Sequence, residues 1–138
     1  EAFKESDVSY EKALKLNPQA ANVLDAYSKN LSNRGEKLEK ARAYSQQANQ
    51  LKPKNPQYQD THAMILFKLK SYELAKEWLD KALSNGGDVY PDILEHYGDV
   101  LFKSDDMESA LEYWKKALEK GSTSEKLEKK IADKKMYE

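Results

Sequence analysis

The sequence contains no cysteine, no long hydrophobic run and almost no net charge. The absence of cysteine excludes disulfide bonds, thiolate metal sites and a cysteine nucleophile, but it leaves the redox compartment undetermined. The longest apolar runs, such as residues 63–67, are far shorter than a membrane span. A formal net charge of −1 lacks the basic excess with which nucleic-acid-binding proteins neutralise phosphates, so nucleic acid is not expected as a partner.

Recognisable catalytic motifs are also missing. The sequence has no glycine-rich phosphate loop, no Gly-x-Ser-x-Gly elbow and no His-Glu-x-x-His zinc motif. His62 and His96 have no other histidine or cysteine near them, so we interpret each as a packing residue rather than a metal ligand. The carboxylates of residues 92, 95 and 99 share a helical face, which a solvated surface explains better than catalysis. We therefore expect neither enzymatic activity nor a cofactor.

Internal repetition is the strongest signal that the sequence does contain. Alanines recur at steps of 34 or 35 residues, at positions 13, 48, 82 and 117. A second alanine set, at positions 41, 75 and 110, has the same steps, and Pro18 and Pro53 are also 35 residues apart. Three independent markers on one period indicate an array of structural repeats.

Within each period the apolar residues have helical spacing. Leu24, Tyr27 and Leu31 fall at i, i+3 and i+7 on one helical face, and Pro56 and Pro91 suit the first position of a helix. No stretch alternates apolar and polar residues for long, so no strand is expected. The pattern predicts helices at about 2–16, 20–33, 37–50, 56–69, 72–84, 91–103, 106–119 and 124–136. Because the connections are short, successive helices should pack antiparallel.

These features resemble the tetratricopeptide repeat, in which a W-x2-L-G-x2-Y helix precedes an A-x3-F helix. Residues 90–122 match best, through Leu94, Tyr97, Gly98, Leu101, Ala110, Trp114 and Ala117. Residues 20–54 depart most, because Ser45 stands where a large residue is usual. The resemblance implies an all-α fold, a right-handed α-α superhelix of antiparallel helix pairs.

The resemblance extends over the whole chain as a single solenoid domain, 1–138. Residues 1–19 correspond to the second helix of a truncated repeat, 20–54, 55–89 and 90–122 to three repeats, and 123–138 to a capping helix. Phe3, Val8 and Tyr10 would then lack packing partners, so further repeats are expected before Glu1. The segments at 34–41 and 94–99 also resemble cell-envelope lipoproteins of Bacteroides-type bacteria, which slightly favours a periplasmic, lipoprotein-anchored location over the cytoplasm.

A ligand surface is also implied by the resemblance, because in this family the first helices of the repeats line a concave groove. The residues at the ligand-facing positions include Asp25, Lys29, Asp60, Met64, Phe67, Lys68, Asp92, Glu95, Asp99, Phe102 and Lys103. Many co-chaperone members grip a C-terminal carboxylate with Lys and Asn, which acids at 25, 60 and 95 would instead repel. A basic or amphipathic segment is expected in its place.

The function expected from this reasoning is a scaffold that holds a peptide or protein segment in the concave groove. Two alternatives stay open. The groove face could be merely solvated, or the repeats could be architectural and link or dimerise a larger envelope protein. In the second case the N-terminal helix is one possible contact for a homo-oligomer.

Overall fold

A computed structural model describes residues 2–136 of the chain, and in this part every regular element is helical. The N-terminal half contains α1 (Ala2–Leu16), α2 (Ala21–Arg34), α3 (Leu38–Leu51) and α4 (Pro56–Lys68). The C-terminal half contains α5 (Tyr72–Ser84), a short 3-10 helix η1 (Gly87–Val89), α6 (Pro91–Lys103), α7 (Met107–Glu119) and α8 (Glu125–Asp133). The bounds agree closely with those predicted, except that α8 ends earlier than residue 136.

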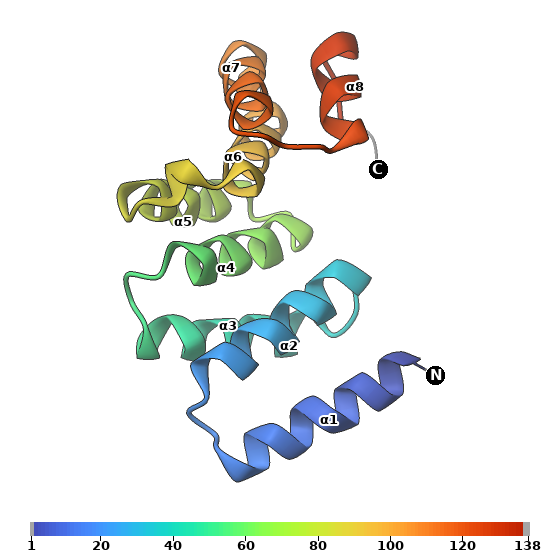
Figure 1. Cartoon of the computed structure of the whole chain (residues 1–138), viewed down its shortest axis with the longest axis vertical. Helices are drawn as coiled ribbons and strands as arrows, with labels where there is room; N and C mark the ends of the chain where they lie inside the picture. Colours follow the sequence, from blue (N-terminus) through green and yellow to red (C-terminus); the bar gives the residue numbers. More distant parts are fainter. Residues whose placement is uncertain (1, 137–138) are drawn as a thin grey trace.

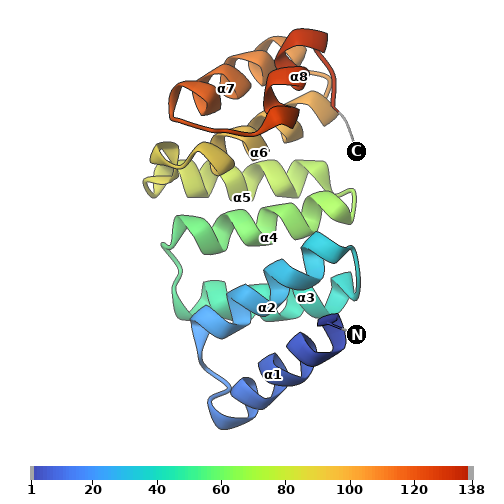
Figure 2. The same ribbon diagram turned by 45° about the vertical axis from the view of Figure 1, so that its right-hand side comes forward.

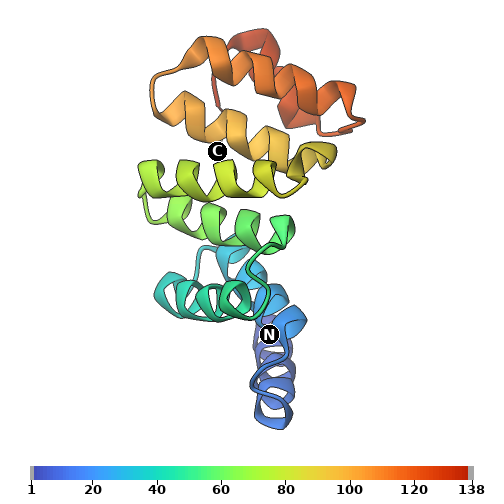
Figure 3. The ribbon, with the colours of Figure 1, turned by 90° about the vertical axis from the view of Figure 1, so that its left-hand side faces the viewer.

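Three antiparallel helix pairs, α2–α3, α4–α5 and α6–α7, are stacked along the long axis of the molecule (Figures 1 and 2). At the two ends of the stack, α1 packs against α2 and α8 packs against α7 (Figure 3). The first helices α2, α4 and α6 also contact one another in order. The observed architecture is therefore the all-α solenoid that the repeat pattern predicts.

Local capping explains where several helices begin and end. The Asn55 side chain accepts hydrogen bonds from the backbone N–H groups of Gln57 and Tyr58 at 3.0 and 3.1 Å, and Pro56 takes the first helical position. Gly35 ends α2 in the left-handed conformation, at a φ of 68° that costs glycine little. Caps of this kind mark the ends of the helices and so limit their length.

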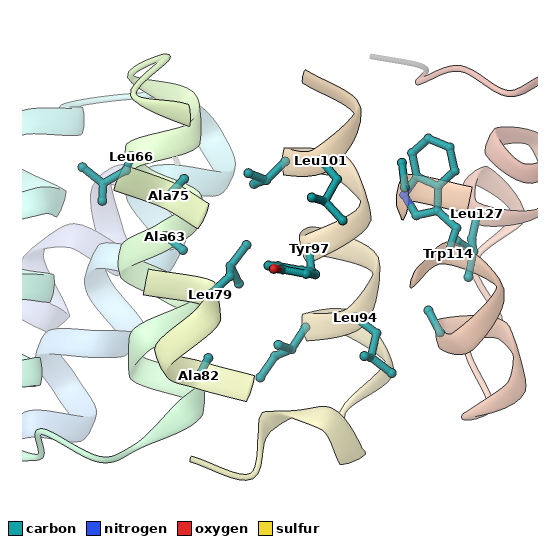
Figure 4. Close-up of a cluster of buried hydrophobic side chains, with 14 residues drawn as sticks. Ala63, Leu66, Ala75, Leu79, Ala82, Leu94, Tyr97, Leu101, Trp114 and Leu127 are labelled. Atoms are coloured by element: carbon teal, nitrogen blue, oxygen red, sulfur yellow. The ribbon is translucent and has the colours of Figure 1, made fainter. Parts of the chain in front are cut away.

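The core of the last two pairs depends on a match between small and large side chains. Ala63 of α4 and Leu79 of α5 lie in one buried cluster, which continues through Trp114 of α7 to Leu127 of α8 (Figure 4). A Cβ atom added to Gly98 would overlap the indole ring of Trp114. The largest core side chain is therefore accommodated only because the facing residue on α6 has no side chain.

The first repeat buries polar groups at the corresponding place. Ser45 occupies the place of Leu79 and Trp114, and its Oγ atom lies 3.0 Å from Nδ1 of His62. The ring of His62 also packs edge-on against Trp78, with 4.5 Å between ring centroids. Burial, with a contribution from nearby cations, lowers the pKa of His62 to about 4, so the ring is neutral near pH 7. His62 fills the space that Ser45 leaves.

The N-terminal helix is attached to α2 by aromatic and ionic contacts. Tyr10 stacks on Tyr27 with 4.9 Å between ring centroids, and an Arg34 nitrogen lies 2.7 Å from Oδ1 of Asp7. Val8 remains 56% exposed, whereas Tyr10 is half-buried. Glu11 also ties α1 to α3, through an ion pair with Lys40 at 3.2 Å and a hydrogen bond from the Tyr44 hydroxyl at 3.0 Å. The expectation for Phe3 concerns a side chain outside the described set. α1 thus packs mainly on α2, over a smaller contact than that between α3 and α4.

Candidate ligand-binding groove

The first helices border a hollow of about 330 Å³ on one side of the solenoid. α2, α4, α6 and α8 all contribute to it. We call this hollow the groove; its lining residues are Lys29, Ser32, Asn33, Asp60, Thr61, Met64, Phe67, Lys68, His96, Asp99, Lys126, Lys130 and Met136. It therefore crosses all three repeats and the C-terminal helix.

Asp60 of α4 is paired within the chain. Its side chain is almost fully buried, and its Oδ1 atom lies 2.8 Å from Nδ1 of His96 on α6. Burial opposes a charge on the imidazole, but the adjacent Asp60 carboxylate outweighs it and raises the pKa of His96 to about 9. His96 is therefore protonated near pH 7 and neutralises Asp60.

Glu95 and Asp99 of α6 share a single cation from α8. The Nζ atom of Lys130 donates hydrogen bonds to Glu95 at 2.7 Å and to Asp99 at 2.8 Å, and the Lys130 side chain is only 6% exposed. The indole N–H of Trp114 donates to the same Asp99 oxygen at 3.0 Å. Burial disfavours the ammonium charge, but Asp99 outweighs it, so the pKa of Lys130 is raised.

Asp25 of α2, unlike Asp60, Glu95 and Asp99, forms no ion pair among the described residues. Its Oδ1 atom is buried without a hydrogen-bond partner among residues 2–136. Burial raises the pKa of Asp25, and the Thr61 hydroxyl and the Lys29 ammonium oppose that rise.

Six of the predicted ligand-facing residues line the groove, namely Lys29, Asp60, Met64, Phe67, Lys68 and Asp99. Glu95 is joined to it through Lys130, whereas Asp25, Asp92, Phe102 and Lys103 are not among the lining residues. Phe102 instead packs on Trp114, with 5.9 Å between ring centroids. A ligand-binding role for the eleven residues stays a prediction.

Sequence reasoning did not select the contribution of the C-terminal segment to the groove. Lys126, Lys130 and Met136 belong to a region that we expected only to cap the solenoid. A signal for Lys130 was present, because it follows Glu95 by 35 residues and so stands at the repeat position of Asp25, Asp60 and Glu95. We call these four residues, 35 apart in sequence, the column; its first three members are acidic and the fourth, Lys130, is a lysine.

The exposed charged side chains that line the groove are all lysines. Asp60 and Asp99 have internal cationic partners, as described above. Within the described part of the chain, no carboxylate forms an ion pair with Lys29, Lys68 or Lys126. These three lysines line the hollow and are exposed.

The helix pair α4–α5 matches a known repeat family. Residues 57–85, which span α4 and α5, match the family model described as Tetratricopeptide repeat. The second repeat is therefore similar to a tetratricopeptide repeat. No curated protein sequence matches the chain.

Solved structures show the same tetratricopeptide-repeat fold over most of the chain. YrrB, described as "a TPR protein with an unusual peptide-binding site", has a TM-score of 0.75 at 23% identity, over 91% of this chain and 63% of that one. PilF of Pseudomonas aeruginosa has a TM-score of 0.75 at 23% identity, over 95% and 63%. The first TPR of Spaghetti (RPAP3), bound to HSP90 peptide SRMEEVD, has a TM-score of 0.75 at 20% identity, over 84% and 90%.

The predicted tetratricopeptide-repeat resemblance and solenoid fold class are thus confirmed. The chain spans less than two thirds of YrrB and PilF, and at these identities the similarity shows the fold alone. Tetratricopeptide-repeat solenoids typically serve as non-enzymatic interaction scaffolds. Among residues 2–136, no helix combines the length and the apolar character needed to cross a membrane. The narrower resemblance to envelope lipoproteins stays a prediction.

Proposed function

We propose that the chain is a protein-interaction module that binds a segment of a partner protein in the groove. The observation that carries this proposal is the hollow itself, which crosses α2, α4, α6 and α8 and exposes apolar surface at its centre. Met64 and Phe67 of α4 are half-buried in it, between polar residues of α2 and α8. Apolar contact area beside a few polar groups is the usual composition of a recognition site.

The solved structures support the same use of the surface by analogy of fold. YrrB is described as having an unusual peptide-binding site, and the RPAP3 domain is described with a bound peptide. Both descriptions concern those proteins. For this chain they make a peptide segment a reasonable first probe.

The contacts of the acidic residues do not support the predicted basic partner. That expectation relied on Asp60, Glu95 and Asp99 being available to a ligand. A basic segment would have to replace His96 at Asp60 and Lys130 at Asp99, which already make hydrogen bonds of 2.8 Å. Replacing one buried ion pair by another offers little net gain.

The groove is tested by selecting binding peptides from a displayed random library and measuring their affinities by fluorescence anisotropy. We expect Met64→Gln to weaken the selected peptides by at least about fivefold, because it replaces apolar contact area at the centre of the hollow with an amide. Val89→Gln is the matched control, since Val89 is 59% exposed on η1 and does not line the groove. Equal losses in the two variants would contradict binding in the groove.

A second candidate function, self-association through α1, is favoured by a specific observation. Val8 and Leu16 of this helix are 56% and 88% exposed. The only extensive helix–helix contact of α1 within the described residues is with α2. Light scattering over a concentration series tests this candidate. A mass that rises with concentration in the unaltered chain and stays monomeric in Val8→Glu would support it, and a constant monomer mass in both would contradict it.

A further inference from the structure

We propose that the segment held in the groove is acidic, and that its carboxylates lie against Lys29, Lys68 and Lys126. This inference rests on the proposed function and adds the chemistry of the partner. The three lysines line one hollow but come from three different helices, α2, α4 and α8. Charge complementarity therefore applies along the whole length of a bound segment.

The charged residues of the groove divide into those paired inside the chain and those open to a ligand. Four lysines and His96 line the groove, against only two carboxylates, Asp60 and Asp99. Both carboxylates make ion pairs inside the chain, with His96 and Lys130 at 2.8 Å. Glu95 shares Lys130 with Asp99, so one carboxylate charge of this set has no cation of its own. The three exposed lysines outnumber the one carboxylate charge left over, so the field that a partner meets along the groove lining is positive on balance.

The apolar residues of the groove lie beside one of these lysines on α4. Met64 and Lys68 are four residues apart on α4 and so project from the same face of the helix. Phe67 lies beside them and packs edge-on against Tyr72, with 5.3 Å between ring centroids. A fitting partner segment therefore carries one or two apolar side chains between acidic residues.

A free chain terminus is not required for this recognition. The available cations are separate side chains on three helices rather than a paired clamp. The acid Asp60 stands on the same helix as Lys68, and Glu95 stands on α6, which carries none of the three lysines. An internal acidic segment meets the same lysines as a C-terminal one. We therefore expect peptides with amidated and free C-termini to bind with similar affinity.

The expected magnitude is modest for each contact and substantial for the set. A single exposed ion pair changes affinity by only about 1.5- to 5-fold, so three together give roughly tenfold or more. Salt weakens such contacts, because the Debye length falls from about 10 Å at 0.1 M to about 3 Å at 1 M. Affinity for an acidic segment should consequently decrease as salt concentration rises.

The experiment is a selection from a displayed library of random twelve-residue peptides with amidated C-termini, performed on the full chain. Enriched sequences are scored for acidic and basic residues. Their affinities are then measured for the unaltered chain and for the triple variant Lys29→Gln, Lys68→Gln and Lys126→Gln. The matched control is Lys52→Gln, Lys54→Gln and Lys115→Gln, which removes three exposed lysines that do not line the groove.

We expect enrichment of acidic peptides, and an affinity loss of about tenfold in the groove variant but less than twofold in the control. Enriched peptides that are basic or uncharged, or an equal loss in both variants, would overturn the acidic partner while leaving groove binding in place. If no peptide prefers the unaltered chain to Met64→Gln, the proposed function fails as well. A twelve-nucleotide single strand that binds as tightly as the selected peptides would also overturn the inference, because the lysines would then attract any polyanion.

Discussion

The Nζ atom of Lys130 in α8 lies 2.8 Å from Oδ1 of Asp99 in α6, and the indole N–H of Trp114 in α7 donates to the same oxygen at 3.0 Å. One carboxylate thus joins three successive helices. Because Lys130 also donates to Glu95, removing its ammonium group would leave two acids of α6 without their cation. The C-terminal helix is held by this charge as well as by the buried Leu127.

Lys130→Met should therefore destabilise the C-terminal end of the solenoid, by about 3 kcal/mol, the usual cost of removing one partner from a buried ion pair. Lys126→Met, on the same helix but without an ion pair among the described residues, should change stability by less than about 0.5 kcal/mol. Urea unfolding measures the total effect, and hydrogen exchange of the α8 amides locates it. Similar losses in the two variants would contradict a structural role for Lys130.

The fit between Gly98 and Trp114 gives a second prediction. Gly98→Ala should destabilise the chain by about 1–3 kcal/mol, because the new methyl group overlaps the indole and the core is already filled. Gly98→Ala combined with Trp114→Leu recreates the Ala63 and Leu79 combination of the preceding repeat. Thermal unfolding should show that the double variant is more stable than the sum of the single effects predicts. Strict additivity would mean that the two residues do not compete for the same space.

A third prediction concerns pH. The pKa of His96 is about 9 in the folded chain, against an ordinary value of 6.5, so folding takes up a proton between these values. The stability from this pair is complete below pH 6.5 and is lost as the pH rises toward 9. We expect the free energy of unfolding to fall by up to about 3 kcal/mol over that interval.

Urea titrations at pH 6.5 and pH 9 test this prediction, with His96→Gln as the comparison. The variant should lose most of the decline, since it has no proton to release. His62 has the opposite sign, because its lowered pKa of about 4 makes stability fall as the pH drops from 6.5 toward 4. His62→Gln should therefore retain the decline above pH 6.5, and an unchanged decline in His96→Gln would contradict the assignment.

The attachment of α1 gives a fourth prediction. Asp7 pairs with Arg34 at 2.7 Å, and the Arg34 side chain is only 8% exposed, so Asp7→Asn should weaken the docking of α1 by about 1–2 kcal/mol. Glu39→Gln breaks a pair with Arg42 that is largely exposed, and should cost less than about 0.5 kcal/mol. Hydrogen exchange of the α1 amides is the appropriate measurement. Faster exchange in both variants, or in neither, would argue against a specific ionic attachment.

The helices and their pairing were predictable because they depend on local pattern. Leu24, Tyr27 and Leu31 share a helical face whatever lies opposite, and Pro56 starts a helix for reasons of its own backbone. Ser45 shows the limit of this reasoning, because the sequence marks it as a departure without showing that His62 fills the space. That compensation depends on the packing of α3 against α4.

The candidate groove was predictable in position but not in charge. The repeat alignment placed Asp60 and Asp99 among the ligand-facing residues, and both line the hollow. Their availability depended on His96 and Lys130, which lie 36 and 31 residues further along the chain. Alignment of equivalent positions describes single residues, whereas neutralisation is a property of contacts between neighbouring repeats.

The column of Asp25, Asp60, Glu95 and Lys130 has a consequence for how such a chain can change in length. Removing residues 56–90 would bring Asp25 to the position from which Asp60 now meets His96. Removing the following 35 residues would instead bring Asp60 opposite Lys130. The charges recur at one interval, so they accept an array with fewer repeats. The contact between Ser45 and His62 instead joins two particular repeats, and removing residues 56–90 would abolish it.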